Sequence, residues 1–357
     1  MTALSPGPDQ AGPAAPEWWG TDEASVRYGD RLALDHVTCR AVPGRVSAVV
    51  GGDGAGRTTL LRCLAGALAV SSGQVRLPVP MRIGYLSAGS GTYPDLSVTE
   101  NLAFRASAYR LPPAIAGERG RELLERTGLA GARDRLAGQL SGGMRQKLGV
   151  IASMLHQPDL LVLDEPTTGV DPVSRADLWW LIARAAADGA AVVLATSYLD
   201  EAERAADVLA LDAGRVLGSG TPQEIVAAMP GTLRVSDARP DGEARRRAWR
   251  RGGRWRIWDP PGGPSPHITD LRHQNQGETD VIMTQIREEI PEEARAEPAG
   301  AREPGWPGAG AADGADGAGS TARAVEPDLQ DAVTVAILAR ELAAEPASGR
   351  PEGGGSR

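Results

Sequence analysis

The chain contains 357 residues with a formal net charge of −8, and hydrophobic residues make up 41% of it. This length allows one large domain and a smaller one, while the acidic balance argues against nucleic acid as the main partner. Lys147 is the only lysine, so arginine carries nearly all of the positive charge. No apolar run is long enough to cross a bilayer, and the Pro- and Ala-rich residues 1–17 are expected to form a disordered leader rather than a signal peptide.

Residues 18–230 show an α/β pattern, in which short apolar runs alternate with helical periodicity. This order favours a largely parallel core sheet with helices on its faces. Cys39 and Cys63 lie in predicted core segments without paired or metal-like spacing, so we expect reduced thiols of a cytosolic protein rather than a disulfide. The predicted strands are Ala33–Cys39, Val46–Val50, Arg82–Leu86, Leu160–Leu163, Ala191–Ala195, Val208–Leu211 and Arg215–Leu217.

A glycine-rich turn follows the strand Val46–Val50 and precedes an apolar helix at Leu60–Leu68. In such a turn the glycines allow successive backbone N–H groups to point at a phosphate. Thr58 stands where a hydroxyl ligand of Mg²⁺ belongs, but Arg57 occupies the position of the usual lysine, so the segment alone is equally compatible with an ordinary turn. The candidate nucleotide-binding residues are Gly51, Gly52, Asp53, Gly54, Ala55, Gly56, Arg57, Thr58 and Thr59.

Between Ala88 and Gln157 the pattern becomes wholly helical. The last helix of this block opens with Ser141, Gly142 and Gly143, which offer a small hydroxyl, free backbone N–H groups and the positive end of a helix dipole. This helix start is therefore suited to binding a phosphate that is not held by the same segment. The predicted helices are Val98–Tyr109, Ala114–Thr127 and Gly142–His156.

The apolar strand Leu160–Leu163 ends in two adjacent carboxylates, Asp164 and Glu165. One carboxylate at such a strand end suits Mg²⁺, and the other suits the positioning of a water molecule. A plain structural role, in which the pair only terminates the strand and caps the next segment, is the alternative.

The segments LSGGMRQ at 140–146 and LDEP at 163–166 resemble the signature and Walker B motifs of ABC transporter ATP-binding subunits. The resemblance implies a P-loop NTPase core with a mixed, largely parallel sheet, an inserted all-helical subdomain at about 88–157, and a small β-rich C-terminal subdomain. Tyr93–Leu102 looks like the start of that helical subdomain in the drug- and lipid-exporter branch, where this face docks the membrane subunit. The resemblance is strong over residues 22–230.

The same resemblance implies ATP and Mg²⁺ as ligands. Thr58 and Asp164 would hold the metal, and Glu165 would orient or deprotonate the attacking water. Tyr28 would stack on adenine, although an ordinary tyrosine at a strand edge would look the same in sequence.

A head-to-tail dimer is also implied, with each ATP between one subunit's P-loop and the other subunit's signature. Ser141, Gly142 and Gly143 would then bind the nucleotide in trans. Asp171 matches the loop that crosses the dimer interface, unless it belongs to a plain Asp-Pro turn.

Three positions depart from the family pattern around the γ-phosphate. Arg57 replaces the P-loop lysine, Ala88 stands where a glutamine is expected, and Ser197 stands where the switch histidine is expected. Guanidinium keeps the charge of lysine but is planar and bulkier. We expect a site that binds nucleotide but hydrolyses it poorly, with Ser197 as a degenerate catalytic position.

Beyond Pro230 the character of the sequence changes. Residues 231–290 are expected to form an accessory region in which Arg245–Trp258 forms a β-hairpin. Its arginines and tryptophans could bind RNA or lipid headgroups, but a half-buried hairpin with a solvated arginine face is the preferred interpretation. A disordered linker at 291–324, a C-terminal helix of the accessory region at 325–345 and a disordered tail at 346–357 are expected to follow.

The sequence thus predicts the ATP-binding subunit of an ABC exporter at the cytoplasmic face of the membrane. Its expected partners are a separate membrane permease and a second ATP-binding subunit, identical or different, and not nucleic acid. A nucleotide-binding regulatory subunit without turnover is the alternative, and an ABC ATPase acting on nucleic acid or ribosomes is a less favoured one.

Overall fold

Two units make up the chain in the computed structural model, which describes residues 17–261 and 323–344. The first unit contains the described residues up to Met229 and those from Pro327 onward, and the second contains those between Pro230 and Glu326. The leader, linker and tail expected at 1–17, 291–324 and 346–357 fall almost entirely outside the described residues. Within the described ranges, no helix combines the length and the apolar character needed to span a bilayer.

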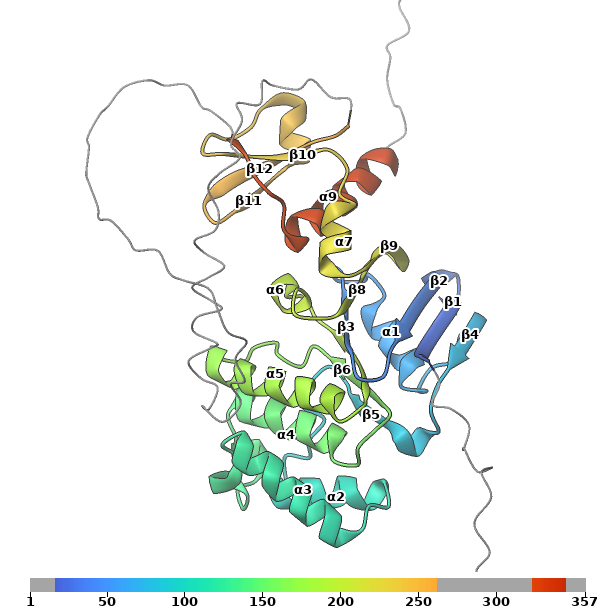
Figure 1. Ribbon diagram of the computed structural model, residues 1–357, viewed down its shortest axis with the longest axis vertical. Helices are drawn as coiled ribbons and strands as arrows, with labels where there is room; N and C mark the ends of the chain where they lie inside the picture. Colours follow the sequence, from blue (N-terminus) through green and yellow to red (C-terminus); the bar gives the residue numbers. More distant parts are fainter. Residues whose placement is uncertain (1–16, 262–322, 345–357) are drawn as a thin grey trace, which may run out of the picture. The chain divides into compact units, whose positions relative to one another are not determined.

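The first unit is built around a six-stranded sheet (Figure 1). All of its neighbouring strands run parallel except β9, which is antiparallel to β8. The carboxyl ends of β3 and β6 therefore meet at the same edge, where polar loops gather in such sheets. In spatial order the strands are β5 (Ile83–Leu86), β6 (Leu160–Asp164), β7 (Ala191–Ala195), β3 (Val46–Val50), β8 (Asp207–Asp212) and β9 (Arg215–Gly220).

A second, three-stranded antiparallel sheet consists of β2 (Arg31–Ala41), β1 (Trp19–Tyr28) and β4 (Ser72–Arg76). The sequence did not predict β1 or β4. The register between β1 and β2 shifts at several points and Glu23 has a positive φ of 48°, so β1 shows no regular alternation of apolar residues. Four of the five residues of β4 are exposed, which leaves no apolar face to recognise.

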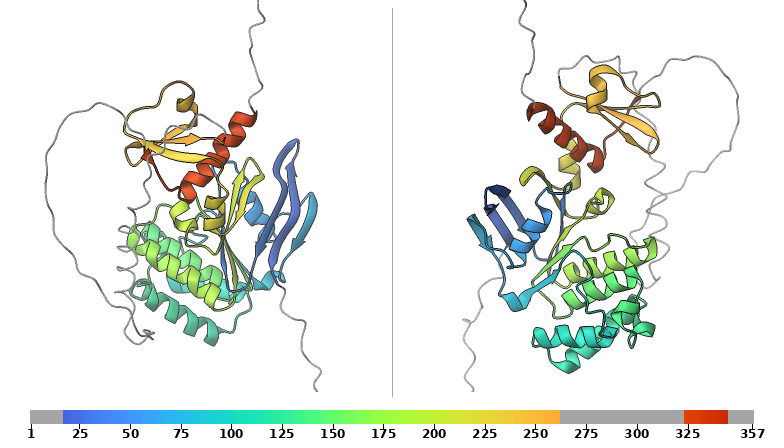
Figure 2. Two further views of the ribbon diagram at one scale, coloured as in Figure 1. Left: turned by 45° about the horizontal axis from the view of Figure 1, so that its top comes forward. Right: turned by 180° about the vertical axis from the view of Figure 1, so that it is seen from behind.

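Helices lie on both faces of the six-stranded sheet (Figure 2). The helical block between β5 and β6 contains α2, α3 and α4, and α2 begins with a capping box formed by Ser97 and Glu100. The α-helices of this unit are α1 (Arg57–Leu64), α2 (Val98–Ala108), α3 (Pro113–Arg126), α4 (Gly142–Met154), α5 (Pro172–Ala187), α6 (Leu199–Ala202), α7 (Pro222–Ala227) and α9 (Leu329–Ala344). Short 3₁₀ helices lie at Pro80–Arg82, Ala130–Ala132 and Ala137–Gln139.

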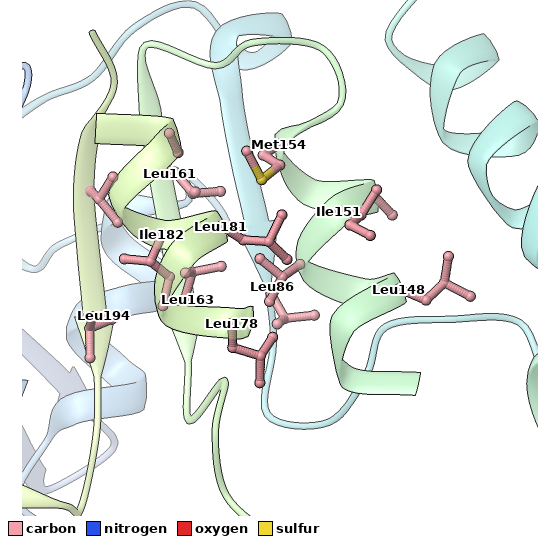
Figure 3. Close-up of a cluster of buried hydrophobic side chains, with 14 of the residues drawn as sticks. Leu86, Leu148, Ile151, Met154, Leu161, Leu163, Leu178, Leu181, Ile182 and Leu194 are labelled. Carbon is pink, nitrogen blue, oxygen red and sulfur yellow. The ribbon is translucent and has the colours of Figure 1, made fainter. Parts of the chain in front are cut away.

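The buried strands alternate between two apolar cores, one on each face of the sheet. Leu161 and Leu163 of β6 face α4 and α5, where Ile151 and Leu181 meet them (Figure 3). Leu160 and Val162 belong to the opposite core, with α1 and the antiparallel sheet. Burial on both faces explains why these strands read as continuous apolar runs in the sequence.

Both cysteines are free and buried in the core around α1, as expected. Burial raises the pKa of the Cys39 thiol to about 12 and that of the Cys63 thiol to about 11. At neutral pH both side chains are therefore uncharged core groups.

The second unit contains a four-stranded antiparallel sheet in the order β11, β12, β10, β13. Strands β11 and β12 flank the Gly252-Gly253 turn and form the hairpin that the sequence predicts. The bounds are β10 (Thr232–Ser236), β11 (Ala248–Arg251), β12 (Arg254–Asp259) and β13 (Arg323–Ala324), with a 3₁₀ helix at Gly242–Arg247.

The C-terminal helix α9 differs from the sequence-based expectation, which assigned it to the accessory region. It belongs instead to the first unit, where it packs against α7 and β9. The reason is its apolar face, since Leu329 and Val333 are buried in the same core as the sheet and Ile337 packs beside them. Arg340 also forms an ion pair with Asp212 at the end of β8.

Candidate nucleotide-binding site

The glycine-rich turn between β3 and α1 adopts a shape that requires glycine at specific positions. Gly51 has a φ of 154°, and a Cβ atom there would lie 2.3 Å from the carbonyl oxygen of Leu211. Gly56 has a φ of 105°, and its Cβ would lie 2.8 Å from the carbonyl oxygen of Ala33. A side chain at either position would displace backbone.

Helix α1 begins at Arg57 without a side-chain cap. The N–H groups of such a first turn have no partner inside the helix, and the dipole makes this end favourable for an anion. A cavity of about 520 Å³ opens beside this helix start. It is lined by Tyr28, Arg31, Leu32, Ala33, Gly52, Asp53, Gly54, Ala55, Gly56, Arg57, Thr58, Thr59 and Ala213.

Tyr28 lies at the end of β1, with 45% of its surface exposed, and lines this cavity. The structure therefore brings the predicted adenine partner and the predicted phosphate-binding residues to one cavity. An exposed aromatic ring beside a phosphate-binding turn provides a face on which a flat base can stack.

Asp164 ends β6 at the same edge of the sheet and is 1% exposed. Burial raises the pKa of Asp164, and a hydrogen bond from Thr58 opposes this effect. Its Oδ2 atom is buried without a hydrogen-bond partner. A buried, unpaired carboxylate oxygen next to a threonine hydroxyl fits the hard oxygen ligands that Mg²⁺ prefers, so these two residues fit the predicted metal site.

Glu165 follows Asp164 and has a positive φ of 51°. Both of its carboxylate oxygens accept hydrogen bonds. Its Oε1 accepts a hydrogen bond from Arg57 Nη1 at 2.5 Å. Its Oε2 accepts one from the Thr168 hydroxyl at 2.8 Å and two from Ser197, from the hydroxyl at 3.2 Å and the backbone N–H at 3.3 Å. The side chain of Ser197 thus reaches the Glu165 carboxylate.

Comparison with known proteins gives the family of this chain. A family model described as "ABC transporter" matches residues 34–168. The daunorubicin resistance ATP-binding protein DrrA3 of Streptomyces coeruleorubidus is 39% identical over 217 residues, which cover 58% of this chain and 69% of DrrA3. The chain belongs to the ABC transporter ATP-binding proteins.

Other members of the family show the same likeness. The probable multidrug ABC transporter ATP-binding protein YbhF of Escherichia coli is 40% identical over 212 residues, 57% of this chain, but the match spans only 37% of the length of YbhF. A Nod factor export ATP-binding protein I of Cupriavidus metallidurans is 37% identical over 210 residues, 56% of this chain and 69% of that protein. A solved ATP-binding subunit of an ABC transporter is 27% identical with a TM-score of 0.56, covering 59% of this chain and 92% of its own.

In this ABC ATP-binding protein the predicted signature residues lie away from the chain's own cavity, at the start of α4. Ser141 is the exposed N-cap, and its hydroxyl accepts a hydrogen bond from the N–H of Met144 at 3.3 Å. Gly142 has no atom within 4 Å of an added Cβ, so the helix start is open. An added Cβ at Gly143 would lie 2.9 Å from the Ser174 hydroxyl.

Asp171 lies next to the signature helix as the N-cap of α5, with Pro172 in the first turn. Its carboxylate accepts a hydrogen bond from the N–H of Ser174 at 2.9 Å, and hydrogen bonds from Ser174 lower the pKa of Asp171. Asp171 therefore caps α5 within this chain. The role across a dimer interface that the resemblance implies would come in addition to this cap.

The sequence predicted none of the contacts that Glu165 makes with Arg57, Ser197, Thr168 and Gln146. Thr168 holds one carboxylate oxygen, and the amide of Gln146 donates to the Glu165 backbone carbonyl at 3.4 Å. Two of these contacts have no signal in the sequence. Thr168 stands only three residues after Glu165, and Gln146 lies within a helix, and neither position forms a distinctive motif. Ala88, the third altered position, is exposed just after β5.

Proposed function

We propose that this protein binds ATP with Mg²⁺ in the cavity beside α1 and serves as the ATP-binding subunit of an ABC exporter. The observation that carries this proposal is the meeting of an uncapped helix start, a buried unpaired Asp164 oxygen and Glu165 at one edge of the sheet. The names of DrrA3, YbhF and the Nod factor export protein support a role in export. The transporter would work at the cytoplasmic face of the membrane, with a separate membrane permease.

In this proposal the first-turn N–H groups of α1 and the guanidinium of Arg57 bind the phosphates, and Tyr28 stacks on the base. Thr58 and Asp164 hold Mg²⁺, which neutralises phosphate charge when bound. Glu165 orients the attacking water and accepts its proton at the carboxylate. The hydroxyl of Ser197 replaces the usual imidazole and holds the Glu165 carboxylate rather than the nucleotide.

The open start of α4 supports a head-to-tail dimer. Ser141, Gly142 and Gly143 would meet the phosphate bound by a second ATP-binding subunit, because they do not line this chain's own cavity. Asp171 caps the neighbouring helix and would hold this face in place.

A nucleotide-binding subunit with little or no hydrolysis is the second candidate. The Arg57–Glu165 hydrogen bond favours it, because Arg57 occupies the carboxylate oxygen Oε1 that a water molecule would otherwise contact. The full chain is expected to bind Mg-ATP but to turn it over about a hundredfold more slowly than the triple variant Arg57→Lys, Ala88→Gln, Ser197→His. Absence of ATP binding would contradict both candidates, and fast turnover abolished by Glu165→Gln would exclude the second.

The partner is tested with the complete transporter. Ser141→Arg places a bulky group where the second subunit's phosphate would lie, so export should stop. If the two subunits differ, Arg57→Ala should be tolerated far better, because Arg57 serves only this chain's own site. Equal losses from both variants would indicate a homodimer, and a greater loss from Arg57→Ala would contradict the division of labour.

A further inference from the structure

One short bond joins the phosphate-binding turn to the end of β6. Arg57 Nη1 donates to Glu165 Oε1 at 2.5 Å, and the two side chains are 12% and 19% exposed. A second carboxylate, Asp53, lies 3.9 Å from Arg57 Nη2, but it is fully exposed to solvent. The guanidinium is therefore held mainly by Glu165.

Arg57 lines the cavity, whereas Glu165 does not. Arg57 is consequently a residue that borders the cavity and whose side chain contacts Glu165. A guanidinium binds carboxylate and phosphate with the same planar fork of donors, so a phosphate in the cavity and the Glu165 carboxylate would compete for it.

The other contacts of Glu165 do not depend on Arg57. Thr168 and Ser197 donate three hydrogen bonds to Oε2 and none to Oε1. When Arg57 leaves, Oε2 remains held in place and Oε1 becomes available. An oriented carboxylate with one open oxygen can hold a water molecule.

We propose that Arg57 is a positioning residue that exchanges anions during the nucleotide cycle. It neutralises Glu165 in the empty site, and the phosphates of the incoming nucleotide take the guanidinium and free Oε1 of Glu165. This inference rests on the proposed function, because it concerns the same nucleotide site. It gives the substituted P-loop position a role beyond that of a weakened phosphate ligand.

Binding of a non-hydrolysable nucleotide tests the competition in the full chain. The probe is adenosine 5′-(β,γ-imido)triphosphate with Mg²⁺, so that hydrolysis does not contribute. Glu165→Gln is expected to tighten binding about tenfold, since a charge-assisted bond no longer has to be broken. In the Arg57→Gln background, Glu165→Gln should change the affinity for the probe less than threefold. Only the direct repulsion between the Glu165 carboxylate and the phosphate is then removed.

The empty protein provides a readout that does not require nucleotide binding. Without nucleotide, the effects of Arg57→Gln and Glu165→Gln on the unfolding midpoint should be non-additive by about 3 °C, and saturating probe should remove this coupling. The exposed pair Arg40–Asp22, with a nitrogen–oxygen distance of 3.0 Å, is the matched control. Its coupling should be near zero and should not change with the probe.

The outcomes separate the two claims. A larger effect of Glu165→Gln with Arg57 present, together with coupling that the probe removes, supports the exchange. Equal effects of Glu165→Gln in both backgrounds, or coupling that persists with bound probe, would overturn it while leaving the proposed function intact. Failure of the unmodified chain to bind the probe would overturn the proposed function and the exchange together.

Discussion

At the scale of single residues, carboxylates at the edge of the sheet differ in how completely they are paired. Glu201 is 1% exposed, and its Oε2 accepts hydrogen bonds from Thr167 at 2.7 Å and Thr196 at 2.9 Å. Asp164 is equally buried, and each carboxylate leaves one oxygen without a hydrogen-bond partner, but Glu201 Oε1 has an ion pair with Arg175 at 3.6 Å, whereas no ion pair is found for Asp164 among the described residues. Burial of an unpaired carboxylate oxygen costs stability unless a ligand satisfies it, so Asp164 is the group most affected by a metal.

Asp164→Asn should therefore raise the thermal stability of the empty protein, because the buried charge disappears, and should abolish stabilisation by Mg²⁺ and nucleotide. For the unmodified chain that stabilisation should be about 2.7 kcal/mol at a ligand concentration a hundredfold above Kd. Thermal unfolding with and without Mg-nucleotide measures both effects. Asp134→Asn, at a side chain that is 87% exposed, is the control and should change neither. Retained Mg²⁺ dependence in Asp164→Asn would exclude Asp164 as a ligand.

His156 is a buried aromatic group in the first unit. Its ring stacks on Tyr109 with centroids 3.6 Å apart, and it is 8% exposed. Burial lowers its pKa from 6.5 to about 4. Between these two values the unfolded chain binds more protons than the folded chain, so stability falls as the pH drops through this window.

His156→Phe keeps the flat ring against Tyr109 but cannot bind a proton. Between pH 7.5 and pH 5 the unmodified chain should lose about 2 kcal/mol of unfolding free energy through this histidine, and the variant should not show this loss. Urea unfolding at both pH values, compared between the two proteins, measures the difference. An identical pH dependence would show that His156 is not the group responsible.

At the scale of elements, α4 connects the proposed trans site to the core. Ser141 and Gly142 are exposed at its start, while Gly143 and, in the second turn, Lys147 are buried. The ammonium group of Lys147 contacts Asp177 of α5 at 2.5 Å and the carbonyl oxygen of Thr127 at 3.2 Å. A helix held by a partly buried ion pair and by close backbone approach can present its N-terminus in a constant position.

Two helical glycines should respond in opposite ways to alanine. A Cβ at Gly149 of α4 would lie 2.1 Å from the carbonyl oxygen of Ser90, so Gly149→Ala should destabilise the protein by about 2 kcal/mol. Gly117 of α3 has nothing within 4 Å of an added Cβ, so Gly117→Ala should stabilise it by about 0.5–1 kcal/mol. Chemical unfolding of the two variants tests this. Effects of the same sign would contradict the close contact of α4.

At the scale of the whole molecule, the first unit is completed by residues far apart in the chain. Helix α9 follows the second unit in sequence, but Leu329 and Val333 lie in the core that contains the sheet strands. The nucleotide site therefore belongs to a unit whose core includes the C-terminal helix. Loss of this helix would expose apolar surface on that unit.

Leu329→Ala should thus lower the unfolding free energy of the nucleotide-binding unit by about 2–4 kcal/mol, as expected for a fully buried leucine. The control is Ile115→Ala in α3, where the side chain is 45% exposed and the change should stay within about 0.5 kcal/mol. Unfolding should be monitored through the loss of nucleotide protection, because this signal comes from the first unit, which contains both the nucleotide site and α9. A Leu329→Ala variant as stable as the control would show that α9 does not contribute to this core.

The fold and the local parts of the site could be predicted from the sequence because their signals are contiguous. Continuous apolar runs predicted strands such as β6, since those strands are buried on both faces. The turn before Arg57 and the helix start at Ser141 were recognised because each depends on glycines or a cap within a few residues. Strands β1 and β4 lack such patterns and were missed.

Contacts between distant parts of the chain were decided only by the tertiary structure. Arg57 and Glu165 are 108 positions apart, and Ser197 lies 32 positions after Glu165. The place of helix α9 in the first unit was likewise decided by the tertiary structure, because an apolar helix face in the sequence does not show which core it covers. The sequence therefore determined which groups we propose for binding phosphate and metal. The parallel order of the strands determined which of those groups touch, because it places the carboxyl ends of β6, β7 and β3 along one edge of the sheet.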